Sequence, residues 1–207
     1  MRYQYTRGGL ARADLSPDPF ILFQQWLKDA LDSPAKEPSA MSLATVDADG
    51  RPSLRTVLLK GFDARGFRFF TSYGSRKGSE LAANPHGSLL FFWAELERQV
   101  RVEGTVERIA REESEEYFHS RPVGSQISAA SSPQSRVVAN RAELESRQRE
   151  VEDRFAGQQV ALPEDWGGYR LWPQNLEFWQ GRPNRLHDRF RYRRTPDDEW
   201  VIERLAP

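Results

Sequence analysis

The chain has no cysteine among its 207 residues, which excludes disulfide bonds, thiolate nucleophiles and cysteine-ligated metals. Its three histidines, His86, His119 and His187, show no spacing typical of a metal site, so we predict that no metal is bound. The remaining polar inventory is rich in Arg, Lys, Ser, Thr and Gln beside aromatic rings. Such an inventory suits the binding of anionic, planar ligands better than nucleophilic catalysis.

Long apolar runs are also missing, since no segment approaches the roughly 18 residues of a membrane span. Residues 1–13 are basic and polar, unlike a secretory signal. Lys and Arg together number 30, as do Asp and Glu, so the net charge is zero and favours no polyanionic partner. We therefore expect a cytoplasmic protein that binds neither membranes nor nucleic acid.

Three common catalytic signatures are absent. The chain has no G-x-x-x-x-G-K-[ST] loop, no G-x-G-x-x-G fingerprint and no G-x-S-x-G elbow. A P-loop nucleotide hydrolase, a Rossmann dinucleotide site and an α/β-hydrolase nucleophile are therefore not indicated.

The hydrophobic pattern and the turn residues between many short strands predict a mainly antiparallel β-barrel with helices packed outside. We expect an exposed arm over residues 1–17 and one domain over residues 18–207. Asp18 and Pro19 are typical of a helix start. Further helices are predicted over 75–84, 111–120 and 141–155, and residues 125–135 are interpreted as a linker. Strands are predicted over 41–46, 54–59, 67–71, 88–93, 99–107, 169–172, 176–180, 189–193 and 200–205.

The first candidate binding segment is Arg-Thr-Val-Leu-Leu-Lys at residues 55–60. On a strand, Arg55 and Lys60 face opposite ways. Two cations on a mostly apolar strand are costly unless each meets an anion. The alternative is that both lie near strand ends and extend into water.

The second candidate is residues 71–78, a strand-to-helix turn with hydroxyls and the adjacent Arg76 and Lys77. Backbone N–H groups at a helix start and two cations suit a phosphate. An ordinary capped helix with a solvated cation pair is the plainer alternative.

The third candidate lies at residues 117–126. Tyr117 and Arg121 are four residues apart, so on a helix they share a face, and Ser125 follows in the next turn or loop. Together they would bind a second phosphate. The alternative is a surface helix ended by Pro122.

The fourth candidate lies at residues 179–189. Arg185, His187 and Arg189 alternate, so on a strand they would share a face that is unfavourable without a ligand or acidic partners. The alternative is a solvated or nucleic-acid-binding basic edge over residues 182–194.

Taken in order and spacing, residues 55–60, 74–77, 96–100, 117–127 and 177–190 resemble the pyridoxamine 5′-phosphate oxidases. The resemblance extends over essentially the whole chain. It implies an antiparallel FMN-binding split β-barrel, a homodimer with FMN at the subunit interface, and an arm that covers the site in some members.

The resemblance also implies roles for individual residues. The implied FMN contacts are Arg55, Thr56, Val57, Leu58, Leu59, Lys60, Phe70, Thr71, Arg76, Lys77, Gln99, Gln134, Ser135, Trp179 and Arg189. The implied substrate contacts are Arg2, Tyr5, Lys60, Tyr117, Arg121, Ser125, Arg185, Leu186 and His187. Arg185 and His187 are the implied catalytic pair beside the pyridine ring.

The implied reaction is hydride transfer from C4′ of pyridoxamine or pyridoxine 5′-phosphate to N5 of FMN, which gives pyridoxal 5′-phosphate. Dioxygen is the acceptor and yields hydrogen peroxide, with ammonia released from the amine. The chain departs from the family at Phe70, where members often have Tyr, and at residues 128–130, Ser-Ala-Ala in place of Gly-Ala-Trp. A split-barrel flavoprotein with another substrate, such as a flavin or heme-related reductase, is the alternative.

Overall fold

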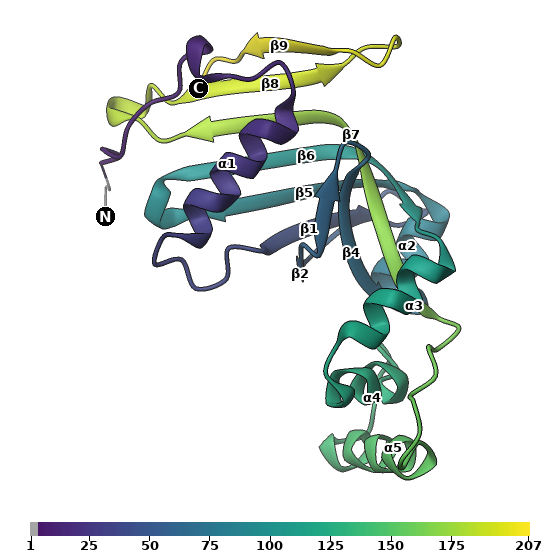
Figure 1. Ribbon diagram of the computed structural model, residues 1–207. Helices are drawn as coiled ribbons and strands as arrows, with labels where there is room; N and C mark the ends of the chain where they lie inside the picture. Colours follow the sequence, from purple (N-terminus) through teal and green to yellow (C-terminus); the bar gives the residue numbers. More distant parts are fainter. Residues whose placement is uncertain (1–3) are drawn as a thin grey trace.

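The computed structural model describes residues 4–207, and one antiparallel sheet organises them (Figure 1). The strand order is β2-β1-β5-β6-β7-β4-β3, with β8 paired to β7 and β9 to β8. The strands are β1 (Ala40–Val46), β2 (Pro52–Leu58), β3 (Gly61–Asp63), β4 (Gly66–Ser72), β5 (His86–Trp93), β6 (Arg98–Arg108), β7 (Trp166–Gln180), β8 (Asp188–Arg194) and β9 (Trp200–Arg204). The prediction of a mainly antiparallel β fold with flanking helices is confirmed.

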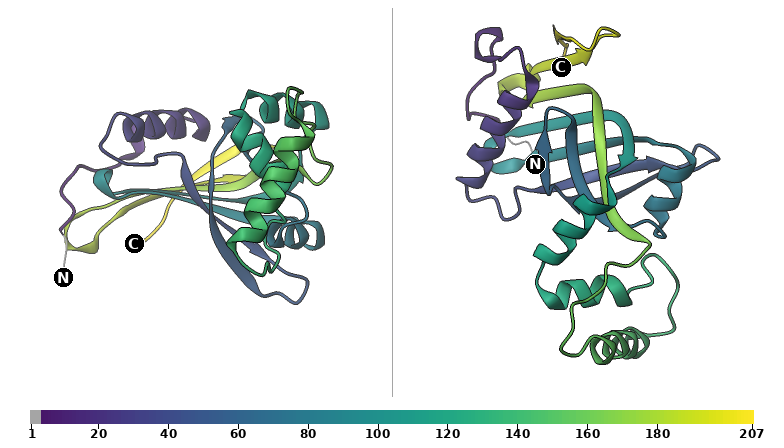
Figure 2. Two further views of the ribbon diagram at one scale, coloured as in Figure 1. Left: turned by 90° about the horizontal axis from the view of Figure 1, so that it is seen from below. Right: turned by 45° about the vertical axis from the view of Figure 1, so that its right-hand side comes forward.

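The helices gather in two places. Helix α1 (Pro19–Leu31) lies on one face of the sheet, as the left view of Figure 2 shows. Helices α2 (Arg76–Ala83), α3 (Arg111–Ser120), α4 (Val123–Ser131) and α5 (Arg141–Arg154) group at the other end of the molecule. The predicted start of α1 is confirmed, because the Asp18 side chain accepts a hydrogen bond from the backbone N–H of Phe20 at 2.9 Å. None of the helices within residues 4–207 is long and apolar enough to cross a bilayer.

The main core lies between α1 and the sheet. Phe23 of α1 is fully buried, and its ring centroid lies 4.8 Å from Phe67 and 5.1 Å from Phe91. Trp26, one turn further, meets Phe178 edge-on at 5.3 Å. The apolar stripe of α1 therefore packs on β4, β5 and β7.

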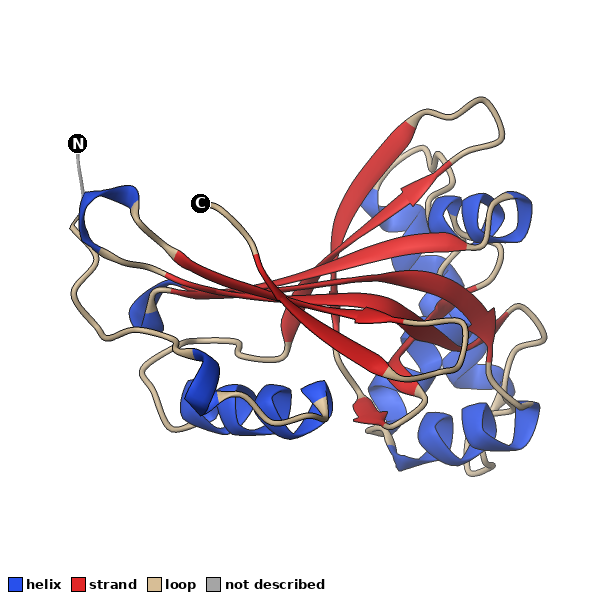
Figure 3. Ribbon diagram, turned by 90° about the horizontal axis from the view of Figure 1, so that it is seen from above, coloured by secondary structure: helices blue, strands red, loops and turns tan. Residues whose placement is uncertain are grey.

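The opposite face of this part of the sheet has no α-helix of the described chain over it (Figure 3). Phe92, Gln99, Trp179 and Arg189 form one row across β5, β6, β7 and β8, because they are directly paired in register. Phe92 is 56% exposed there, and the edge strand β2 adds Leu54 at 69%. We call this surface the open sheet face.

Three local predictions are wrong. Residues 125–135 are not a linker, because α4 forms there and packs Ile127, Ala129 and Ala130 against Phe118 and Trp166. The strands predicted at 169–172 and 176–180 are one strand, β7, which continues through Pro173 beside a β6 register shift at Glu103/Gly104.

The third error concerns the predicted strand face of Arg185, His187 and Arg189, because only Arg189 lies on β8. His187 directly precedes the strand, and Arg185 is further away. Arg185 lies in the short 3-10 turn η3 (Pro183–Arg185) before β8 begins. Asn184 and Arg185 both have left-handed backbone, with φ of 58° and 62°. This turn carries Arg185 away from the sheet ladder.

Candidate functional site

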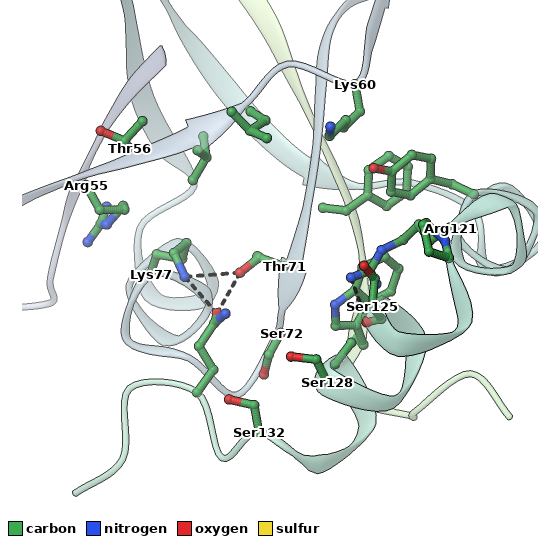
Figure 4. A pocket seen from close by; sticks show the side chains of 18 residues that line it. Arg55, Thr56, Lys60, Thr71, Ser72, Lys77, Arg121, Ser125, Ser128 and Ser132 are labelled. Atoms are coloured by element: carbon green, nitrogen blue, oxygen red, sulfur yellow. Dashed lines mark hydrogen bonds between the residues drawn. The ribbon is translucent and has the colours of Figure 1, made fainter. Parts of the chain in front are cut away.

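A pocket of about 750 Å³ lies between the edge strand β2, strand β4 and helices α2, α3 and α4 (Figure 4). It collects most of the first three candidate segments. The predicted residues that line it are Arg55, Thr56, Val57, Leu58, Lys60, Phe70, Thr71, Lys77, Tyr117, Arg121, Ser125 and Gln134. Residues not predicted also line it: Ser72, Pro122, Ser128, Ala129, Ser132 and Trp166.

Lys77 is the best-defined cation of this pocket. Its side chain is nearly buried, at 8% exposure, and its Nζ donates to Thr71 Oγ1 at 3.0 Å, Ser75 Oγ at 3.2 Å and Gln134 Oε1 at 2.8 Å. These acceptors are all neutral. Burial, and then repulsion by Arg55, lower the Lys77 pKa to about 8. A buried ammonium whose hydrogen-bond partners are all neutral fits an anionic ligand.

The start of α2 adds to this anion site. Ser75 is the N-cap, and its side chain accepts from the Gly78 backbone N–H. Arg55 lies nearby on β2, where its Nη1 donates to Leu43 O at 3.1 Å and its Nη2 to Glu80 Oε2 at 3.1 Å. Oriented N–H groups and two cations make the helix start favourable for a phosphate.

A second polar group lies across the same pocket. Figure 4 shows Arg55 and Lys77 on one side and Lys60, Arg121 and Ser125 on the other. Arg121 Nη2 donates to Ser125 O at 2.8 Å, while its buried Nη1 has no partner within the described chain. Burial lowers the pKa of Arg121. This second group therefore also fits an anion.

The backbone around Tyr117, Arg121 and Ser125 differs from the prediction. Helix α3 ends at Ser120, and Arg121 is its C-cap with extended backbone, so Tyr117 and Arg121 do not share a helix face. Ser125 lies in the first turn of α4 and not in a loop. The two side chains reach the pocket because α3 and α4 meet at an abrupt turn.

Aromatic rings form one wall of the pocket. Phe70 stacks on Tyr117 at 3.8 Å between centroids, and Trp166 continues the stack at 5.7 Å from Phe70. The Arg121 guanidinium lies 4.9 Å from the Trp166 ring. Phe70 therefore keeps a stacking role without a hydroxyl. Ala130 is partly buried beside the same cluster, where α4 forms without the family's Trp.

The remaining predicted residues lie elsewhere. Leu59 is buried in the core, Arg76 points to Glu80 at 2.8 Å, and Ser135 is exposed in a left-handed turn. A second set, which we call the Trp179 group, sits at the far end of β7. It consists of Tyr5, Gln99, Trp179, Arg185, Leu186, His187 and Arg189, and none of these residues lines the pocket. Arg2 lies outside the described residues.

Ring contacts hold the Trp179 group together. The centroids of Trp179 and His187 are 4.7 Å apart, and Tyr5 lies 5.5 Å from each. The Arg182 backbone N–H donates to His187 Nδ1 at 3.0 Å, which assigns the proton of the neutral ring to Nε2. Burial, and then Arg185, lower the His187 pKa. Arg185 and Leu186 are exposed at the surface.

Acidic partners neutralise much of the basic edge at residues 182–194. Arg189 is paired with the buried Glu177 at 2.7 Å, and Arg191 and Arg193 with Glu203 at 2.6 and 3.5 Å. Arg194 is paired with Asp198 at 2.8 Å. This pairing leaves little of the free cationic surface that nucleic-acid binding needs.

The N-terminal arm docks on the Trp179 group through a carboxylate that the sequence did not reveal. Glu97 is 1% exposed, and its Oε2 accepts from the backbone N–H groups of Thr6 at 2.8 Å and Arg7 at 2.9 Å. Leu10 is buried, and its N–H donates to Asp188. Gly181 leaves room for the Tyr5 ring, since a Cβ there would lie 2.7 Å from it. Glu97 lies within residues 96–100, one of the stretches that resemble the family, and this was the sequence signal that could have singled it out.

We expect Glu97→Ala to release this arm. Two hydrogen bonds to a charged acceptor would be lost, so the Thr6 and Arg7 amides should exchange with deuterium about 10- to 100-fold faster. Glu95→Ala, in the same turn but exposed, is the matched control. Unchanged exchange in Glu97→Ala would show that other contacts fix the arm.

The described chain has the split-barrel fold, as predicted. A pyridoxamine 5′-phosphate oxidase-related, FMN-binding protein from Nostoc punctiforme superposes with a TM-score of 0.72 at 18% identity, covering 93% of this chain and 98% of that one. PhzG from Burkholderia lata, solved with tetrahydrophenazine-1-carboxylic acid, gives a TM-score of 0.89 at 32% identity, covering 96% and 98%.

Sequence comparison defines the family. The pyridoxamine 5′-phosphate oxidase family model matches residues 27–155, and that of the pyridoxine 5′-phosphate oxidase C-terminal dimerisation region matches 166–207. The pyridoxine/pyridoxamine 5′-phosphate oxidase of Pseudomonas paraeruginosa is 57% identical, covering 100% of this chain and 97% of its own. That of Burkholderia mallei is 56% identical with the same coverage. The chain belongs to the pyridoxine/pyridoxamine 5′-phosphate oxidase family.

Proposed function

We propose that this protein oxidises pyridoxamine and pyridoxine 5′-phosphate to pyridoxal 5′-phosphate, with FMN as cofactor and dioxygen as acceptor. The observation that carries the proposal is the pair of cationic groups facing each other across one pocket. A phosphorylated cofactor and a phosphorylated substrate together need two such groups. The full-length relatives that carry the oxidase name support the same substrates.

The residues around Lys77 fit the FMN phosphate. Lys77, Thr71 and the start of α2 provide an ammonium, a hydroxyl and N–H donors, and Arg55 adds a second cation. When bound, the flavin supplies hydride acceptance and reoxidation by dioxygen, which gives hydrogen peroxide. The role of the chain is to bind both ligands and hold them in contact.

The second group fits the substrate phosphate. Lys60 and Arg121 supply charge, and the hydroxyls of Tyr117 and Ser125 supply further hydrogen bonds. The unpartnered Nη1 of Arg121 is a donor available for that anion. Binding there would leave the pyridine ring beside the aromatic wall of Phe70 and Tyr117.

We also propose that a second copy completes each site. The Trp179 group lies at the other end of β7 from Trp166, and Trp179 is about 43 Å from Trp166 measured along the strand at 3.3 Å per residue. The match of residues 166–207 to a dimerisation region and the open sheet face support a homodimer that brings the Trp179 group of one copy to the pocket of the other.

We expect Phe92→Asp to break this dimer. The substitution places a charge on the open sheet face, where desolvation opposes association. Light scattering should show a monomer, with at least about tenfold weaker FMN binding. Ile21→Asp, equally exposed on α1 at 57%, should remain dimeric. A dimeric Phe92→Asp variant would place the interface elsewhere.

The test of function is the absorbance spectrum of the purified protein, before and after pyridoxamine 5′-phosphate is added in air. A flavin spectrum, a growing aldehyde band and peroxide are expected. A flavin spectrum without turnover would favour another substrate. The tetrahydrophenazine-1-carboxylic acid bound by PhzG would then be one compound to assay. Failure to reconstitute with FMN would contradict the proposal.

A further inference from the structure

Glu80 of α2 is a buried carboxylate directly behind the anion site. It is 5% exposed and lies one turn after Arg76. Its Oε2 accepts from Thr45 Oγ1 at 2.5 Å, Ser53 Oγ at 2.6 Å and Arg55 Nη2 at 3.1 Å. Its Oε1 accepts from Arg76 Nε at 2.8 Å. Four donors thus converge on one side chain.

These donors come from three separate elements. Thr45 lies on β1, Ser53 and Arg55 lie on β2, and Arg76 starts α2. Strand β2 pairs only with β1 within the described chain, so its outer edge carries no strand that would fix its position. The same strand forms a wall of the pocket. Glu80, which lies on α2, therefore fixes the edge strand β2 to that helix through Ser53 and Arg55.

The charge of Glu80 needs an explanation. Burial raises the pKa of its carboxyl, but hydrogen bonds from Ser53, Thr45, Arg76 and Arg55 outweigh this effect and lower the pKa to about 2. Glu80 is thus anionic at neutral pH, and a negative charge beside a phosphate site opposes binding. Glu80 must therefore favour anion binding in another way, by more than this repulsion opposes it.

Glu80 contributes by orienting the Arg55 guanidinium. Arg55 has a long side chain that would otherwise lose conformational freedom on binding the anion. Arg55 is already fixed by Glu80, Ser53, Thr45 and the Leu43 carbonyl. Lys77 is held separately by its neutral acceptors. The entropy cost of ordering Arg55 is therefore met when the chain folds.

We propose that Glu80 is a positioning residue for the cofactor phosphate: it holds Arg55 in place at the anion site and joins β2 to α2. The inference rests on the proposed FMN function. It assigns Glu80 no contact with the cofactor and no part in the oxidation itself.

The test compares FMN with riboflavin, which has the same ring but no phosphate, on the cofactor-free protein. Glu80→Gln keeps the size of the side chain but replaces one acceptor oxygen by an NH2 donor, so the four donors can no longer all be satisfied. Quenching of flavin fluorescence should show FMN binding weakened by about tenfold or more, with riboflavin binding changed less than about twofold.

Glu113→Gln is the matched control. Glu113 also faces two arginines, Arg68 at 3.4 Å and Arg170 at 3.6 Å, and neither lines the pocket. Both flavins should bind this variant as they bind the wild type. Ser53→Ala, which removes one donor to Glu80 from a half-exposed position, provides a milder change should Glu80→Gln fold poorly. It should weaken FMN severalfold and leave riboflavin unchanged.

The outcomes separate the two proposals. If the wild type binds FMN and the Glu80 and Ser53 variants keep the wild-type preference for FMN over riboflavin, the positioning role is overturned. Equal weakening of both flavins would also overturn it, because that result indicates general loss of structure. A wild type that binds neither flavin would refute the proposed cofactor itself.

Discussion

Replacing Lys77 with Met should weaken FMN binding by about a hundredfold, the largest single effect expected at the pocket. The substitution removes a buried ammonium that has three neutral partners and would meet the phosphate directly. A charge-assisted hydrogen bond in a buried site is worth more than an exposed one, and its loss leaves the phosphate poorly matched. Riboflavin binding should change little, and Lys36→Met, on an exposed loop, is the control.

The same lysine predicts a pH dependence. The free-protein pKa of Lys77 is lowered to about 8, and the phosphate favours the protonated form. FMN affinity should therefore be constant below about pH 8 and fall by up to about tenfold per pH unit above it. Titrations from pH 6.5 to 9.5 would measure this, and Lys77→Met should lose the dependence. A flat wild-type profile would mean that Lys77 does not meet the phosphate.

Arg185→Ala should lower kcat by about a hundredfold or more while the protein keeps its FMN. Arg185 is exposed on η3, beside His187, at a left-handed position that turns it away from its own sheet. In the proposed dimer it would hold the substrate ring against the flavin, and loss of such orientation acts on turnover. Steady-state rates with pyridoxamine 5′-phosphate and the flavin content of each preparation would measure both effects.

A suitable control for Arg185 is Arg193→Ala, since Arg193 is paired with Glu203 on the neighbouring strand. Its kcat should stay close to that of the wild type. Full turnover by Arg185→Ala at saturating substrate would remove Arg185 from the proposed catalytic pair and leave His187 as the candidate.

Sequence patterns predicted the helix starts, because a helix start depends on residues that are close together in the sequence. Asp18 and Pro19 marked the start of α1, and Ser75 followed by two cations marked the start of α2. Residues from all three segments, 55–60, 71–78 and 117–126, line one pocket, and the phosphate-binding roles inferred from their residue types stay a prediction. The order and spacing of these segments resembled one family, and that resemblance predicted the split β-barrel, which no single motif indicated.

Features that depend on distant partners were not predictable in this way. The Ser- and Ala-rich stretch at 125–135 is helical because Phe118 and Trp166 give it a surface to pack on. Two strands were predicted at 169–172 and 176–180, but β7 is continuous between them, where β6 shifts register. Glu80 and Glu97 look like surface charges in sequence, since all their partners except Arg76 lie 25 to 91 residues away.

The length of β7 has a consequence for mixtures of defective proteins. One strand carries Trp166 at the pocket and Trp179 near its other end, so damage to either end leaves the other intact. In the proposed dimer, Lys77→Met, which weakens FMN binding, and Arg185→Ala, which lowers kcat, should complement each other when the two chains are refolded together at limiting FMN. Half of the resulting dimers would be mixed, and each would contain one undamaged site, restoring about a quarter of the wild-type activity.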